Sequence, residues 1–237
     1  PVHNIDTEID YALLGPAVAD PLTLDGHTIT IDPVTLTENV SVTKRLIIIG
    51  SGRTATILDG NIDLVAPDHA TQRLVLQDLG VVTTSNTNLS VNTRYAIWID
   101  GAAGDLAPIT LDNVKARGLN TGNFVYGTGI VISPNGNSID DLVIQNCEII
   151  DNYTHGIRVV NTNGSTSGTL SNFSLESSTV DNNDAKPLAS GGERIGLSIA
   201  QYNTSPNLVV NQISIEDCSF NGYQSSGTGN GKGMYIE

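Results

Sequence analysis

Several aromatic and polar residues of this chain have the chemistry that carbohydrate-binding surfaces use. Trp98, Arg158 and Tyr235 lie in short apolar segments, and Tyr153 and His155 flank the start of the segment that contains Arg158. Aromatic rings offer flat apolar surfaces to a sugar ring, and polar groups beside them form hydrogen bonds. These residues predict a glycan-binding surface, provided that the fold gathers them on one face. The alternative interpretation is that the tyrosines only pack loops against the fold.

Four acidic residues near this set could bind a divalent cation. Calcium prefers carboxylate oxygens, which Asp151, Asp181, Asp184 and Glu193 would supply if their loops converge. A polysaccharide lyase could combine such a site with a base, but the guanidinium of Arg158 stays protonated and is a poor base. Acidic residues in Asn-rich turns are also common on protein surfaces. We therefore expect that no cofactor is required, with Ca²⁺ as the alternative.

These residues belong to a repeated unit that contains two phrases. The first phrase has eight residues, and its five copies occupy residues 74–81, 109–116, 142–149, 173–180 and 213–220. The second phrase is short and apolar, and its five copies occupy residues 96–99, 129–132, 156–159, 196–199 and 233–236. A unit that recurs every few tens of residues is typical of a stacked fold in which each unit contacts its neighbours. Function should then be sought on a face of the stack.

Alternation of apolar and polar residues predicts three strands in each unit. Ile144 points inward from its strand, so stacking at about 4.8 Å should place it beside Leu111 of the preceding unit. A bend follows this strand in every unit. The bend residues have short polar side chains that can bond nearby backbone and tolerate unusual turn angles: Asp78, Asn113, Asn146, Ser177 and Asp217.

The short apolar phrase should present one residue of each copy on its outer face. These residues are Trp98, Val131, Arg158, Ser198 and Tyr235. A glycoside hydrolase needs two carboxylates about 5 to 9.5 Å apart around the scissile bond. Because none of the five residues is acidic, this face is predicted to bind rather than to catalyse.

The two cysteines test the predicted register. Cys147 and Cys218 occupy the same position of the repeat, with Ser178 between them. Two steps of a stack separate them by about 9.6 Å, whereas a disulfide requires Cα atoms within about 7 Å of each other. We therefore expect two free, buried thiols.

Composition and charge narrow the class of protein. The chain has 237 residues, of which 5% are aromatic, and a formal charge of −14. Its many Asn, Thr, Ser, Gly, Val and Ile residues, without helical periodicity after about Val18, favour an all-β fold. A surface of this charge repels polyanions, which argues against nucleic acid as a partner. No apolar run approaches the roughly 20 residues needed to span a bilayer.

Four phrases near the start of the chain resemble a known family: GHTITI from Gly26, TENVSVTK from Thr37, LIIIGSG from Leu46 and TILDG from Thr56. They are similar to the opening of pectin-lyase-like right-handed parallel β-helix proteins, especially secreted or surface-attached bacterial repeat proteins. The resemblance covers nearly the whole chain and implies an all-β, right-handed, three-sheet parallel β-helix. The family includes lyases, hydrolases, epimerases, adhesins and structural proteins, so the resemblance does not define a function.

The resemblance also implies a short N-terminal helix that caps the first coil. The segment from Ile5 to Val18 fits this role, with Thr7 as its N-cap and Gly15-Pro16 at its end. We expect residues 1–20 to form the cap and residues 21–237 to form about six coils of a single domain, starting near Ile29, Ile57, Ile97, Ile130, Ile157 and Leu197. A strand at the end of the sequence predicts an open C-terminal edge, which would continue in a longer chain or meet a further domain or a second copy.

Together these features predict a non-enzymatic extracellular β-helix domain of a bacterial surface or secreted protein. Its role would be structural or adhesive, with a polysaccharide or cell-surface glycan as the partner. One alternative is a polysaccharide lyase or glycoside hydrolase that acts on an acidic polysaccharide. The other is a subunit that assembles end to end into filaments.

Overall fold

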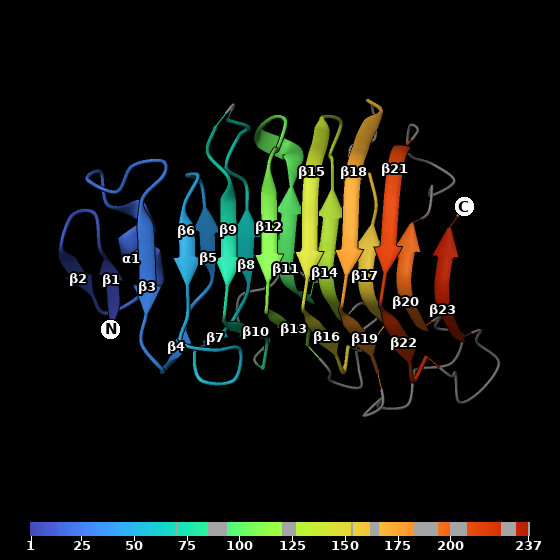
Figure 1. The fold of residues 1–237 in the computed structure, drawn as a ribbon, viewed down its shortest axis with the longest axis horizontal. Helices are drawn as coiled ribbons and strands as arrows, with labels where there is room; N and C mark the ends of the chain where they lie inside the picture. The colour runs from blue at the N-terminus through green and yellow to red at the C-terminus, as the bar shows by residue number, and fades with distance from the viewer. Residues whose placement is uncertain are drawn as a thin grey trace.

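The computed structural model shows a chain wound into a stack of short β-strands (Figure 1). It describes residues 1–69, 71–84, 94–119, 127–152, 154–161, 166–182, 194–199, 208–223 and 231–236. In these ranges the strands are accompanied by one α-helix, α1 (Leu14–Ala19), and one short 3-10 helix, η1 (Gly101–Ala103). No helix of the described part has the length and apolarity required to cross a bilayer.

The strands form three sheets that run along the axis of the stack. Sheet A contains, in spatial order, β2 (Ile9–Tyr11), β1 (Val2–Asn4), β3 (Thr28–Ile31), β6 (Ile47–Ile49), β9 (Leu74–Gln77), β12 (Ile109–Asp112), β15 (Ser138–Gln145), β18 (Gly168–Glu176) and β21 (Leu208–Glu216). Sheet B contains β4 (Thr35–Thr37), β7 (Ile57–Asp59), β10 (Gly80–Val82), β13 (Lys115–Arg117), β16 (Glu148–Ile150), β19 (Thr179–Asp181) and β22 (Ser219–Asn221). Sheet C contains β5 (Val40–Val42), β8 (Ile62–Leu64), β11 (Arg94–Asp100), β14 (Gly127–Ser133), β17 (His155–Val159), β20 (Arg194–Ile199) and β23 (Gly231–Ile236).

The chain visits sheets A, B and C in turn, and each circuit is one coil. The described strands make seven coils, from β3, β4 and β5 to β21, β22 and β23. Strands of successive coils pair in parallel in all three sheets. This arrangement confirms the predicted all-β, three-sheet parallel β-helix.

Successive coils align like residues with like residues in the core. Leu111 of β12 pairs directly with Leu76 of β9 on one side and with Ile144 of β15 on the other. The next coils continue the line with Leu175 and Ile215. All of these side chains except that of Ile215 are fully buried. The predicted register between Leu111 and Ile144 is therefore confirmed, and the apolar core runs along the axis of the stack.

The predicted bend lies between each strand of sheet A and the following strand of sheet B. Its five residues have φ angles between 46° and 55°, in the left-handed region: Asp78, Asn113, Asn146, Ser177 and Asp217. Their side chains also bond between coils, since Asn113 Nδ2 donates to Asp78 Oδ1 at 2.5 Å and Asn146 Nδ2 donates to Asp112 Oδ1 at 2.8 Å. Short polar residues suit the bend because they tolerate this conformation and bond locally.

Both cysteines are free, as the register predicts, but only Cys147 is buried; Cys218, also predicted to be buried, is partly exposed. Ser178 lies between them, because the Cys147 amide donates to Ser178 Oγ at 3.0 Å and the Ser219 amide donates to the Ser178 carbonyl at 3.1 Å. Burial raises the pKa of the Cys147 thiol to about 12. That thiol therefore stays protonated and acts as a small apolar core group.

The N-terminal cap differs from the predicted helix. Residues 2–11 form the antiparallel hairpin β1–β2, which extends sheet A beyond β3, and α1 begins only at Leu14. The amides of Leu14 and Gly15 donate to the carboxylate of Glu38 at 2.7 and 2.9 Å. Pro16 lies in the first turn, where a missing N–H breaks no intrahelical bond, so it helps to start the helix rather than to end it. Thr7 lies in the turn of the hairpin and caps no helix.

The predicted positions of the first two coils are also wrong. The spacing of apolar phrases places Ile29 and Ile57 in the sheet of Ile97, but Ile29 lies in β3 of sheet A and Ile57 in β7 of sheet B. Ile97 pairs instead with Ile62 of β8. These coils have short strands and lack the eight-residue phrase, so apolar spacing alone does not distinguish the three sheets there.

Candidate functional site

Sheet C carries the predicted outward residues on one face. Direct strand pairing places seven residues in a line, here called the outer line: Ser41, Asp63, Trp98, Val131, Arg158, Ser198 and Tyr235. The five residues that the repeat predicts are thus side by side, one on each strand from β11 to β23. At the usual strand spacing the outer line is about 30 Å long.

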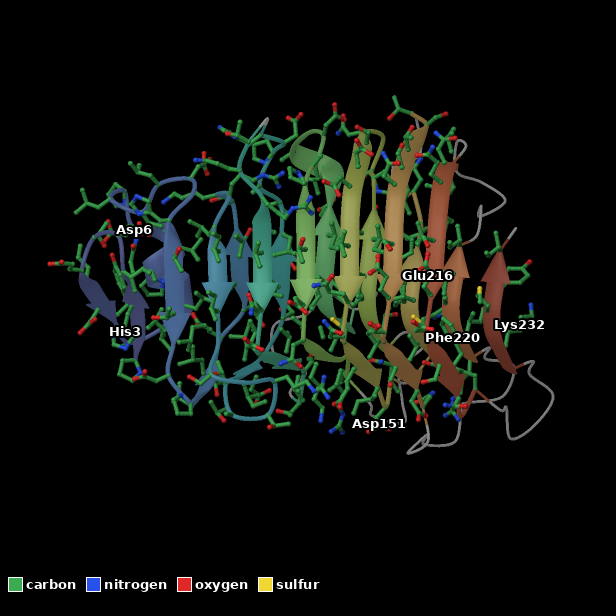
Figure 2. The ribbon with its side chains drawn as sticks, in the orientation of Figure 1. His3, Asp6, Asp151, Glu216, Phe220 and Lys232 are labelled. Atoms are coloured by element: carbon green, nitrogen blue, oxygen red, sulfur yellow. The ribbon has the colours of Figure 1, made fainter. Side chains whose placement is uncertain are left out.

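A second line runs beside the first and contains Tyr95, Thr128, His155, Ile195 and Lys232. Burial, with the charge of Arg158 as a further cause, lowers the pKa of His155 to about 3, so its ring is neutral at ordinary pH. Lys232 lies near the C-terminal end of the stack in Figure 2, with its Nζ 3.8 Å from the centre of the Tyr235 ring. Tyr153, the remaining predicted residue, lies outside the described residues.

Trp98 and four nearby residues are here called the Trp98 group: Asn61, Asp63, Tyr95 and Asp100. The rings of Tyr95 and Trp98 pack edge to face, with centroids 5.0 Å apart and an interplanar angle of 71°. Asp63 of β8 is the direct strand neighbour of Trp98. Asp100 lies two residues further along β11, where its Oδ1 accepts hydrogen bonds from the Ala102 amide at 2.9 Å and from Asn135 Nδ2 at 3.2 Å.

The carboxyl group of Asp63 lies in an unusual electrostatic setting. Burial raises the pKa of Asp63, and the negative charge of Asp100 acts in the same direction. Hydrogen bonds from Tyr95 and Asn61 oppose this shift, the latter from Asn61 Nδ2 to Asp63 Oδ1 at 3.0 Å. Burial and the neighbouring Asp63 also raise the pKa of Tyr95, so its hydroxyl remains a donor. A partly buried carboxylate with a raised pKa is typical of functional sites.

Two buried polar atoms of the Trp98 group have no hydrogen-bond partner among the residues that the structure describes. They are Nε1 of Trp98, a donor, and Oδ1 of Asn61, an acceptor. The Asn61 residue is only 5% exposed. Most buried polar groups are satisfied, and each exception costs stability. A bound molecule with a matching acceptor and donor would satisfy both atoms.

The two acids at this face are absent from the predicted site. Asp63 occupies the outer line one coil before Trp98, and strand geometry places its Cα atom about 8 Å from that of Asp100. The five predicted positions contain no acid, as the sequence indicates, but Asp63 adds an acidic position to the same line. A signal for Asp63 existed, because the segment NIDL at residues 61–64 alternates like the short apolar phrase. Its Ile62 precedes Ile97 by 35 residues, the spacing that separates Leu76 from Leu111.

The structure describes two of the four residues predicted to bind calcium. Asp151 and Asp181 lie at the ends of neighbouring strands of sheet B, and the Asp151 amide donates to the Asp181 carbonyl at 2.9 Å. Asp184 and Glu193 lie outside the described residues. Within the described ranges, no three His, Cys, Asp or Glu side chains cluster as metal ligands would.

Comparison with known proteins gives one structural similarity to report. Neither a family model nor a curated protein matches the sequence. A solved structure titled "Geobacillus virus E2 - ORF18" is 17% identical to the chain over 84% of its length, with a TM-score of 0.45. The alignment covers 35% of that protein, so this chain spans about a third of its length.

Proposed function

We propose that the chain is an extracellular β-helix domain of a bacterial surface or secreted protein and that it binds glycans without cleaving them. The binding surface is the outer face of sheet C, centred on the Trp98 group. The observation that carries this proposal is the unpartnered indole N–H of Trp98, set in an aromatic pair beside two carboxylates. A sugar ring packed on the indole would accept a bond from Nε1 and donate hydroxyl bonds to the acids.

The sheet itself supports the binding of a polymer. The outer line repeats once per coil on parallel strands, so an extended chain laid along the axis would meet a new side chain at each step. The extracellular location rests on the resemblance to pectin-lyase-like β-helix proteins. The formal charge of −14 is in keeping with a solvated surface.

The single tryptophan of the chain allows a direct test. A glycan that binds at this face should shift the fluorescence of Trp98 in a saturable manner. Trp98→Ala should abolish retention on immobilised polysaccharides without changing the circular dichroism spectrum, and Trp98→Phe should restore part of it. Equal retention of wild type and Trp98→Ala would remove the proposed surface.

Incubation of the same protein with a polysaccharide tests the alternative that this face is catalytic. Glycoside hydrolysis needs a pair of carboxyl groups, and Asp63 and Asp100 are two acids on this face, so new reducing or unsaturated ends from a bound polysaccharide would indicate turnover. We expect none, with or without Ca²⁺. Product formation that disappears in Asp63→Asn would replace the binding role by an enzymatic one.

A further inference from the structure

The charge around Trp98 restricts the glycan that the proposed surface can take, and this inference rests on the proposed function. Of the two strand neighbours of Trp98 in the outer line, Asp63 is acidic and Val131 is uncharged. The charged group that acts on Asp63 is a second acid, Asp100. The nearest cation of the outer line is Arg158, two strands away from Trp98, which is about 10 Å. Charges at such a distance are largely screened at physiological salt.

The hydrogen-bonding groups point to the same class of ligand. The Trp98 group offers acceptors on Asp63, on Asp100 and on the unpartnered Oδ1 of Asn61. Its donors are fewer, because the Tyr95 hydroxyl already bonds Asp63 and only Trp98 Nε1 lacks an acceptor. A surface with more acceptors than donors is complementary to a ligand rich in donors.

We infer that the Trp98 group selects sugars that carry hydroxyl or amine donors and no negative charge, and that it rejects uronic acids. A sugar carboxylate would bring a third negative charge beside Asp63 and Asp100 and would leave the acceptors of the site unpaired. Such like-charge contacts are a common means of excluding wrong partners. An amine would instead pair with the two carboxylates, and a neutral sugar would donate its hydroxyls to them.

The experiment compares three oligosaccharides of equal length at physiological ionic strength, by isothermal titration calorimetry for all variants and also by Trp98 fluorescence for the wild type. The probes are cellohexaose, chitosan hexamer and hexagalacturonate, which are neutral, cationic and anionic. The neutral or the cationic probe should bind at least about tenfold more tightly than the anionic one. Added salt should reduce the difference, because it screens the repulsion.

Two matched variants show whether Asp63 causes the selection. Asp63→Asn should bring the affinities of the anionic and neutral probes to within about threefold of each other. Asp112→Asn makes the same change of net charge on sheet A, so it should leave the ranking unchanged. An equal effect of both variants would overturn the assignment to Asp63.

The outcomes separate this inference from the function on which it rests. If hexagalacturonate binds as tightly as the other probes and Trp98→Ala abolishes its binding, the surface binds glycans but the selection is wrong. If none of the three probes alters Trp98 fluorescence, both the glycan-binding role and its selectivity are rejected. Tighter binding of the neutral or cationic probe, lost in Trp98→Ala, supports both.

Discussion

The coils pair in parallel in both sheet A and sheet C, but the polar side chains on the outer faces of these sheets differ in their hydrogen bonding. On sheet A, polar side chains bond each other. Ser214 Oγ donates to Glu216 Oε1 at 2.7 Å, and Figure 2 shows Glu216 on the front of this sheet. Arg73 reaches along the stack to Thr110 at 3.0 Å and also pairs with Asp141, which joins three coils.

Sheet C leaves polar groups without partners in the Trp98 group. Nε1 of Trp98 and Oδ1 of Asn61 are buried and unsatisfied, and burial raises the pKa of Asp63 because it disfavours the ionised form. Stacking of strands does not by itself leave polar groups unsatisfied, because the polar side chains described above on the similar strands of sheet A bond each other. Unsatisfied polar groups on the outer face of sheet C, with bonded polar groups on that of sheet A, are expected if only sheet C binds a ligand.

The largest expected effect concerns the core that both faces share. Ile144→Asp should lower the free energy of unfolding by more than about 4 kcal/mol, because an unpaired charge would enter a fully buried position. Val143→Asp, on the same strand but facing outward, should cost far less. Urea unfolding followed by circular dichroism measures both. Similar midpoints for the two variants would contradict the assigned inward and outward faces.

A smaller effect is expected at the bends beside sheet A. Asn146→Ala should cost about 1 to 3 kcal/mol, because alanine is strained at a φ of 55° and the bond to Asp112 is lost. Asn146→Gly should cost less, since glycine adopts this conformation freely and only the bond is lost. Chemical unfolding ranks the two variants. A glycine variant less stable than the alanine variant would show that backbone conformation is not the main cause.

The direct comparison of the two faces uses the same substitution on each. The raised pKa of Asp63 means that its ionised form destabilises the fold above this pKa, a cost that disappears as pH falls below the ordinary range of an aspartate. Asp63→Asn should therefore raise the unfolding midpoint at pH 7 and lose this advantage near pH 3. Asp112→Asn should lower the midpoint at pH 7, because Asp112 accepts the Asn146 bond. Destabilisation by both variants would remove the contrast between the faces.

The smallest effect is expected at the exposed N-terminal edge of sheet A. The hydrogen bond to Asp10, with Asp32 also near, raises the pKa of His3. Its stabilising contribution is full below the ordinary histidine pKa and is lost as pH rises through the raised value. His3→Gln should thus lower the midpoint slightly at pH 5 and leave it unchanged at pH 9. An effect that is larger at pH 9 would show that the charge of His3 is not involved.

Much of the stack could be predicted from the sequence because its core repeats. Leu111 beside Ile144, the left-handed bend at Asn146 and the free thiols of Cys147 and Cys218 all follow from one alternating pattern. Burial of one side of every strand makes a register shift costly, so the pattern of apolar residues specifies the pairing. The outer line from Trp98 to Tyr235 follows in the same way.

The structure of the N-terminal cap could not be predicted from the sequence pattern. Residues 5–18 have local features of a helix start, but the hairpin β1–β2 extends the edge of sheet A instead. The short helix that follows depends on Glu38, whose carboxylate accepts the amides of Leu14 and Gly15. A local pattern does not contain a partner more than twenty residues away, so tertiary contacts override it.

By itself, the sequence determined the coil, its register and the side of each strand that is buried, because these depend on alternation within a few residues and on its repetition. Only the tertiary structure decided which groups surround Trp98 and which of their atoms lack partners. Asp63 reaches Trp98 from the preceding coil, and Asn61 comes with it. These contacts depend on how far each intervening loop carries the chain before the next strand joins the sheet.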